Sequence, residues 1–152
     1  MARKLQFTYT QFKTIYSKTT RLCVDILIKN EKGILLILRK KNGWLNQWHF
    51  PGGMVFYREK IIDTVHRIAN EELGVEVKIQ KNLGYIEYFS ELKERGFGYS
   101  VSIVFLCRPL NSNFILDDIT GKVKYFNTIP NNTVIEQKDF IVGMLKYSHV
   151  RH

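Results

Sequence analysis

Residues 53–75 read GMVFYREKIIDTVHRIANEELGV and carry the most informative pattern in the chain. The apolar spacing predicts a helix over about residues 58–73, with Glu71 and Glu72 near its end. Arg67 precedes Glu71 by one turn, so the two side chains share a helix face. Two adjacent carboxylates beside a glycine-rich turn offer the oxygen ligands that Mg²⁺ or Mn²⁺ prefers, and such an ion usually bridges to phosphates. The pattern predicts a divalent-metal site, although a solvated glutamate pair on an amphipathic helix would read the same way.

The spacing of these residues resembles the Nudix box, G-x5-E-x7-R-E-U-x-E-E-x-G-U, where U is a bulky aliphatic residue. Pro51-Gly52 comes directly before it, and the matching positions are Gly53, Glu59, Arg67, Glu71, Glu72, Gly74 and Val75. The resemblance implies an α+β Nudix fold, in which a mixed β-sheet is sandwiched between helices as an α/β/α sandwich. It also implies Mg²⁺-dependent (or Mn²⁺-dependent) hydrolysis of a nucleoside diphosphate linked to another moiety, such as a nucleotide sugar.

The same resemblance assigns roles within the box. Glu71, Glu72 and the Gly52 carbonyl are expected to hold the metal, and Glu71, Glu72 and Arg67 to form the catalytic machinery. Gly53, Glu59 and Gly74 are expected to be structural: Glu59 starts the helix, where a carboxylate suits the helix dipole, and can pair with Arg67. Gly74 suits the left-handed position after a helix.

One departure from the box bears on catalysis. Ile68 stands where the family has a glutamate that is often a metal ligand or the base, and an aliphatic side chain can be neither. Two interpretations follow: a divergent enzyme whose base lies elsewhere, or a domain that binds a ligand without turning it over. For an enzyme, Asp117 or Asp118 in a late loop is the expected base, ahead of His49, although an acidic pair of this kind also suits a turn.

The N-terminal half is similar to GDP-mannose mannosyl hydrolases, a Nudix branch with an aliphatic residue at the same place. The shared features are a short helix before the first strand, Asp25 within that strand, an Asn30–Gly33 turn, Arg39 after the hairpin, and the segment Trp48–Gly53. This resemblance implies that Asp25 and Arg39 contact substrate, and His49 is expected to face the same pocket. An aspartate inside an apolar strand needs a partner or a pocket unless it lies on an exposed face.

The mannosyl-hydrolase resemblance fails at two places. Met54 replaces an arginine, and no histidine occurs between His66 and His149, so attack on a sugar carbon by a histidine base is not supported. Release of the sugar from GDP therefore stays an alternative reaction. A hydrolase of RNA ends is a weaker alternative, suggested only by charge.

The remaining pattern predicts one domain over residues 1–152. We expect an N-terminal helical extension over 1–20, with a helix over 10–18 capped by Thr10, and a C-terminal helix over 136–147. We expect strands over 22–29, 34–39, 75–80, 83–88, 99–108 and 122–127, and a loop over 90–98 that forms a mobile lid.

Composition sets the broad class. The net charge of +9 comes from basic residues spread along the chain, which favours an anionic ligand without indicating nucleic acid. No apolar run approaches the roughly 18 residues of a membrane span, and the N-terminus lacks the apolar core of a secretory signal. Cys23 and Cys107 lie in apolar runs, as expected for buried thiols in a reducing cytoplasm. The resemblance also allows a homodimer.

Overall fold

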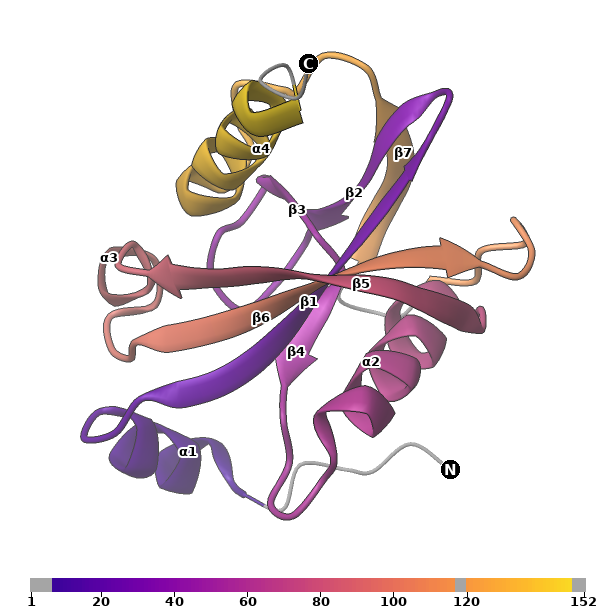
Figure 1. Ribbon diagram of the computed structural model, residues 1–152. Coiled ribbons are helices and arrows are strands. Elements are labelled where there is room, and N and C mark those ends of the chain that lie inside the picture. The colour runs from indigo at the N-terminus through magenta and orange to yellow at the C-terminus, as the bar shows by residue number, and fades with distance from the viewer. Residues whose placement is uncertain (1–6, 117–119, 149–152) are drawn as a thin grey trace.

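The computed structural model describes residues 7–116 and 120–148 and shows a mixed sheet with helices on both faces (Figure 1). In chain order the elements are α1 (Tyr9–Tyr16), β1 (Arg21–Asn30), β2 (Gly33–Arg39), β3 (Trp48–His49), β4 (Gly52–Met54), α2 (Ile61–Ile68), the π-helix η1 (Ala69–Leu73), β5 (Val77–Tyr88), α3 (Glu91–Arg95), β6 (Ser100–Pro109), β7 (Thr120–Phe126) and α4 (Ile135–Ser148).

Strand β1 is the centre of the sheet. It runs parallel to β6, and β5 pairs antiparallel with the far side of β6. β1 pairs with β2 only beside their connecting turn, at Lys29–Ile34 and Asn30–Gly33. Beyond that point β4 takes the place next to β1, while β2 pairs with β3 and β7. The two halves of the sheet therefore separate, and this separation makes room for a pocket.

Two apolar cores cover the two faces of the sheet. Val24 and Ile26 of β1 pack with Val65 of α2 in one core. Leu27 of β1 packs with Phe50 and with Ile141 of α4 in the other. Because β1 is buried on both faces, its sequence is almost continuously apolar. The predicted sandwich of a mixed sheet between helices is confirmed.

The helix of the box begins later than predicted and ends differently. Arg58 has a φ of 59°, a left-handed conformation that no α-helix includes, so α2 starts only at Ile61. The last turn widens into η1, which ends at Gly74 with a φ of 64°. A Cβ there would also press on Ile115, so the predicted glycine after the helix is confirmed.

Three other local predictions are wrong. The strands expected over 75–80 and 83–88 form the single strand β5. Its pairing with β6 shifts register between Ile79 and Lys81 and between Asn82 and Gly84, and this irregular stretch resembles a break between two strands in the sequence pattern. The loop expected over 90–98 contains the short helix α3. Helix α1 is capped by Thr8 in a capping box, not by Thr10. No helix among the described residues is long and apolar enough to cross a membrane.

Candidate active site

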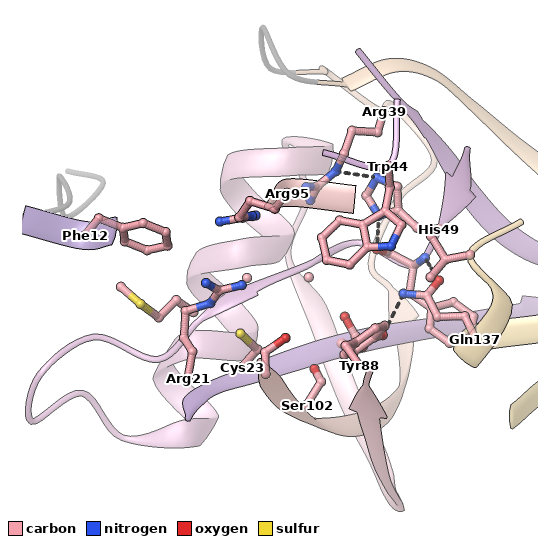
Figure 2. A pocket seen from close by; sticks show the side chains of 17 residues that line it. Phe12, Arg21, Cys23, Arg39, Trp44, His49, Tyr88, Arg95, Ser102 and Gln137 are labelled. Carbon is pink, nitrogen blue, oxygen red and sulfur yellow. Dashed lines mark hydrogen bonds between the residues drawn. The ribbon is translucent and has the colours of Figure 1, made fainter. Parts of the chain in front are cut away.

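A pocket with a volume of about 200 Å³ lies where the two halves of the sheet separate (Figure 2). Its floor is one face of β1, where Arg21, Cys23 and Asp25 alternate inward. Arg39, Trp44 and His49 come from the opposite side. Gly52, Gly53 and Met54 form part of the wall, so the glycine turn that begins the box also borders the pocket.

Arg67 holds the turn, the loop and the helix of the box together. Its Nε and Nη2 donate to the two carboxylate oxygens of Glu59 at 2.8 and 3.0 Å, and Nη2 also donates to the Met54 carbonyl at 2.6 Å. Its third nitrogen, Nη1, donates to Glu71 at 3.1 Å. The guanidinium also stacks 3.7 Å from the Phe56 ring. All three guanidinium nitrogens have protein partners, including the expected pair with Glu59, whereas a catalytic role for Arg67 stays a prediction.

The pKa of Glu59 reflects this arrangement. Burial acts to raise the pKa, but the bonds from Arg67, from the Thr64 hydroxyl and from the Phe56 N–H outweigh it and lower the pKa to about 2. Thr64 donates to Glu59 at 2.6 Å and the Phe56 N–H donates at 3.2 Å. Glu59 is therefore ionised and fixed at neutral pH, consistent with the structural role expected of it.

Glu71 and Glu72 lie on η1 beside the glycine turn. The Gly52 N–H donates to Glu72 Oε2 at 3.1 Å, and Glu71 pairs with Arg67 with its side chain 30% exposed. Both groups and the backbone carbonyl of Gly52 are hard oxygen donors, so their chemistry fits Mg²⁺ or Mn²⁺. Within the described residues no three His, Cys, Asp or Glu side chains converge in a way that could hold a metal. An ion here would therefore keep several waters or phosphate oxygens as ligands.

Ile68 lies in the core against the glycine turn that borders this corner. It is 2% exposed and packs in the core between α2 and the sheet, with its Cδ1 close beside Gly53. An aliphatic residue suits this buried position, because a carboxylate here would lose its hydration and would need an ion or a hydrogen bond to compensate. The structure thus explains the departure from the box as packing.

Asp25 has the partner and the pocket that were expected for it. It is buried, accepts a hydrogen bond from the Tyr88 hydroxyl, and lines the pocket. Gln137 donates to the same hydroxyl at 2.8 Å and accepts from the Phe50 N–H at 2.7 Å. Burial raises the pKa of Asp25 to about 6, against the lowering effect of the Tyr88 hydrogen bond. A Cβ on Gly52 would overlap the Asp25 carboxylate, so only glycine fits at that position.

His49 and Arg39 lie together in the opposite wall. His49 Nδ1 is 2.6 Å from the Phe50 carbonyl, and its Nε2 accepts a long contact of 3.4 Å from Arg39 Nε. Burial, and then the charge of Arg39, lower the pKa of His49 to about 3, so the ring is neutral with its proton on Nδ1. Both predicted pocket residues are thus brought beside Asp25.

Asp117 and Asp118, the expected sources of a base, lie outside the described residues. Conversely, Arg21, Cys23 and Gln137 are among the pocket residues that the sequence did not predict. The alternation Arg21, Cys23, Asp25 along one strand face was the available signal for the first two. Gln137 gave no signal, because its role depends on α4 crossing the pocket. The aromatic side chains of Trp44 and Tyr88 also line the pocket.

Comparisons with known proteins agree with this geometry. The chain is 36% identical over 84 residues, 55% of its length, to the low-salt glycan biosynthesis protein Agl8 of Haloferax volcanii. It is 30% identical over 111 residues, 72% of its length, to an ADP-ribose pyrophosphatase of Methanocaldococcus jannaschii. The matches span 54% and 64% of those two relatives. The crystal structure of a MutT protein from Methanosarcina mazei superposes with a TM-score of 0.71 at 21% identity, covering 85% of this chain and 95% of that one.

A comparison with models of whole families also finds a match. The model of the NUDIX domain matches residues 19–128, a range that contains β1 to β7 and the whole box. This range is well over half of the chain. The protein therefore belongs to the NUDIX domain family.

Proposed function

We propose that this protein hydrolyses a nucleoside diphosphate linked to another moiety, with a nucleotide sugar as the substrate class. The observation that carries the proposal is the shared wall: Gly52 to Met54 border both the pocket and the corner of Glu71 and Glu72. A diphosphate at this turn would have its two substituents on either side, one of them in the pocket. The names of two relatives support this substrate class, because one is an ADP-ribose pyrophosphatase and the other is a glycan biosynthesis protein.

The metal corner and the pocket walls have different tasks in this proposal. Glu71, Glu72 and the Gly52 carbonyl would hold Mg²⁺, which when bound neutralises the diphosphate and orients water. Arg67 and Glu59 fix the turn against the helix, so the carboxylates are oriented before substrate arrives. Arg39 would contact a phosphate, and Asp25 with neutral His49 would accept or donate hydrogen bonds to the remaining substrate. Asp118, or Asp117, is proposed as the base.

The test is a panel of nucleotide sugars and ADP-ribose, each incubated with Mg²⁺ and the wild type, Glu72→Gln or Glu76→Gln. Glu76 is an exposed carboxylate close in sequence and outside the pocket, which makes it the matched control. We expect Glu72→Gln to lose at least about a hundredfold in kcat/KM and Glu76→Gln to match the wild type. Equal rates for the wild type and Glu72→Gln would reject the proposed metal corner.

Product analysis in ¹⁸O-labelled water identifies the bond that breaks. Attack at phosphorus yields a nucleoside monophosphate and a sugar phosphate, with the label on one phosphate. Attack at carbon yields the free labelled sugar and a nucleoside diphosphate, which is the mannosyl-hydrolase alternative. We expect phosphorus attack, since neutral His49 has both ring nitrogens engaged by the protein.

Ligand binding without turnover is the second candidate function, and the burial of Ile68 favours it. The box carries no carboxylate at that position to serve as a third acidic ligand or as the base. Micromolar binding of a nucleotide sugar by calorimetry, with no product from the wild type after prolonged incubation with Mg²⁺ or Mn²⁺, would establish this role. The cytoplasmic location and the homodimer stay predictions from the sequence.

A further inference from the structure

The end of the pocket farthest along β1 from Asp25 is built from two arginines around one glutamate. Arg21 of β1 and Arg95 of α3 both lie against Glu91, which is completely buried. Arg21 pairs directly with this carboxylate, and Arg95 Nε is 3.8 Å from it. Figure 2 shows both guanidinium groups facing the pocket, next to Phe12. The Phe12 ring lies 5.2 Å from Arg21 and 5.6 Å from Arg95 and covers this end.

This cluster has one positive charge more than it has negative charge. Cys23, the nearest other titratable side chain in the floor, is neutral because burial raises its pKa to about 11. Ser100 and Ser102 add only neutral hydroxyls. Asp25 is engaged with Tyr88 at the other end. Burial, and then the charge of Arg21, lower the pKa of Arg95 to about 10, which still leaves it charged at neutral pH.

Some of the N–H donors of Arg21 and Arg95 have no hydrogen-bond acceptor in the described part of the chain. Among the described residues, Nη1 of Arg21 and Nε of Arg95 are buried without a hydrogen-bond partner, and so is Oε2 of Glu91. A buried charged N–H without an acceptor is costly, so proteins rarely keep one unless something fills the place. An oxyanion in the pocket would accept from the guanidinium groups of Arg21 and Arg95 that line it and would balance the excess charge.

We propose that Arg21 and Arg95 form a second anion site, which selects substrates carrying a carboxylate or phosphate monoester in addition to the diphosphate. The inference rests on the proposed hydrolysis of nucleoside diphosphate derivatives and narrows the substrate class to those with a further acidic group. The diphosphate itself belongs at Gly52, opposite Asp25 in the strand register. Arg21 comes four residues before Asp25 on β1, which places it roughly 13 Å from Asp25 along the strand. A different part of the substrate would therefore reach Arg21.

Matched substrate pairs test the selectivity. UDP-glucuronate and UDP-glucose differ by one carboxylate, and ADP-ribose 2′-phosphate and ADP-ribose differ by one phosphate monoester. For each pair the ratio of kcat/KM, charged over uncharged, is measured in the wild type, Arg95→Gln and Lys93→Gln. Lys93 is an exposed cation on the same helix, outside the pocket. The ratio is internally normalised, so a general loss of activity cancels.

We expect a ratio of at least about ten in the wild type for one pair, since a charge-assisted hydrogen bond is worth roughly that factor or more. Arg95→Gln should bring the ratio close to one, and Lys93→Gln should leave it unchanged. The double variant Arg21→Gln with Glu91→Gln removes the buried pair together, which avoids leaving one buried charge alone, and should also bring the ratio close to one. A wild-type ratio near one for both pairs, or a ratio that neither variant changes, would overturn the second anion site.

A binding measurement separates this proposal from the failure of hydrolysis. Trp44 lines the pocket with its ring 5.9 Å from Arg95, so its fluorescence reports occupancy without turnover. If no substrate is hydrolysed, tighter binding of UDP-glucuronate than of UDP-glucose that is lost in Arg95→Gln still supports the second anion site. The same comparison is made for ADP-ribose 2′-phosphate and ADP-ribose, and equal binding within both pairs would reject the second anion site.

Discussion

Replacing Asp25 with asparagine should stabilise the protein at neutral pH while impairing its pocket. The carboxyl is buried and its pKa lies at about 6, compared with an ordinary value of 3.8. A carboxyl with a higher pKa in the folded state binds its proton more tightly there. Its contribution is therefore fully present below about pH 4 and is lost as the pH rises through 6. The difference between the two pKa values corresponds to about 3 kcal/mol at pH 7.5, as an upper estimate.

Asparagine keeps the acceptor for the Tyr88 hydroxyl and removes the buried charge. We expect the free energy of unfolding of Asp25→Asn to exceed that of the wild type by about 2–3 kcal/mol at pH 7.5. At pH 3.5 the two should match, because the wild-type carboxyl is then protonated in both the folded and the unfolded state. For a chain of 152 residues that gain raises Tm by about 4–12 °C.

Urea unfolding followed by tryptophan fluorescence, at pH 3.5, 6 and 7.5, measures this difference. Asp139→Asn, at an exposed carboxylate on α4, is the control and should show no comparable gain at any pH. Equal stability of Asp25→Asn and wild type at pH 7.5, with unchanged m-values, would show that the buried carboxylate is fully solvated or paired and would refute the reasoning. A loss of kcat/KM in the same variant would show that the carboxylate is retained for substrate at the expense of stability.

Three further substitutions test the packing around the box. Glu59→Gln weakens the paired bonds with Arg67 and should lower the free energy of unfolding by about 2–4 kcal/mol. Because the pKa of Glu59 is lowered to about 2, this part of the wild-type stability is present above about pH 4.5 and lost as the pH falls toward 2, which unfolding at stepwise lower pH measures. Ile68→Glu, which restores the usual glutamate of the box, should destabilise the protein by about 2–5 kcal/mol without raising kcat, and a gain in kcat would contradict the packing explanation. Gly52→Ala should cost about 1–3 kcal/mol through overlap with the Asp25 carboxylate and the Val24 carbonyl, and partial recovery of stability in Gly52→Ala with Asp25→Ala would verify the share of Asp25.

Sequence reasoning was most successful where spacing and chemistry coincide. The spacing of five residues indicated the family: Gly53, Glu59, Arg67, Glu71 and Glu72. In the structure the Arg67 guanidinium bonds to Glu59 and Glu71, and the Gly52 N–H donates to Glu72. Such a local motif is readable because its parts lie within a helix and the turn before it. The family comparison confirmed it over residues 19–128.

Predictions from the sequence were less successful where the local structure depends on single backbone conformations or on contacts between distant residues. The left-handed Arg58, the two register shifts in β5 and the helix α3 leave no clear trace in apolar periodicity. The expectation of a loop over 90–98 is wrong for a tertiary reason, whereas its movement as a lid stays a prediction. Glu91 within it is buried against Arg21, a partner 70 residues away, and this contact anchors the segment.

The box is readable from the chain because its residues lie within one turn and one helix, and its resemblance to a known family carried the sandwich fold with it. What lies across from Glu71 and Glu72 depends on contacts between distant segments. β1 and β2 separate beyond their turn, and α3 and α4 close over the space, so Arg21, Asp25, Arg95 and Gln137 meet in one pocket. Their burial then sets their charges and partners, and burial is a property of the packed molecule that no single segment carries.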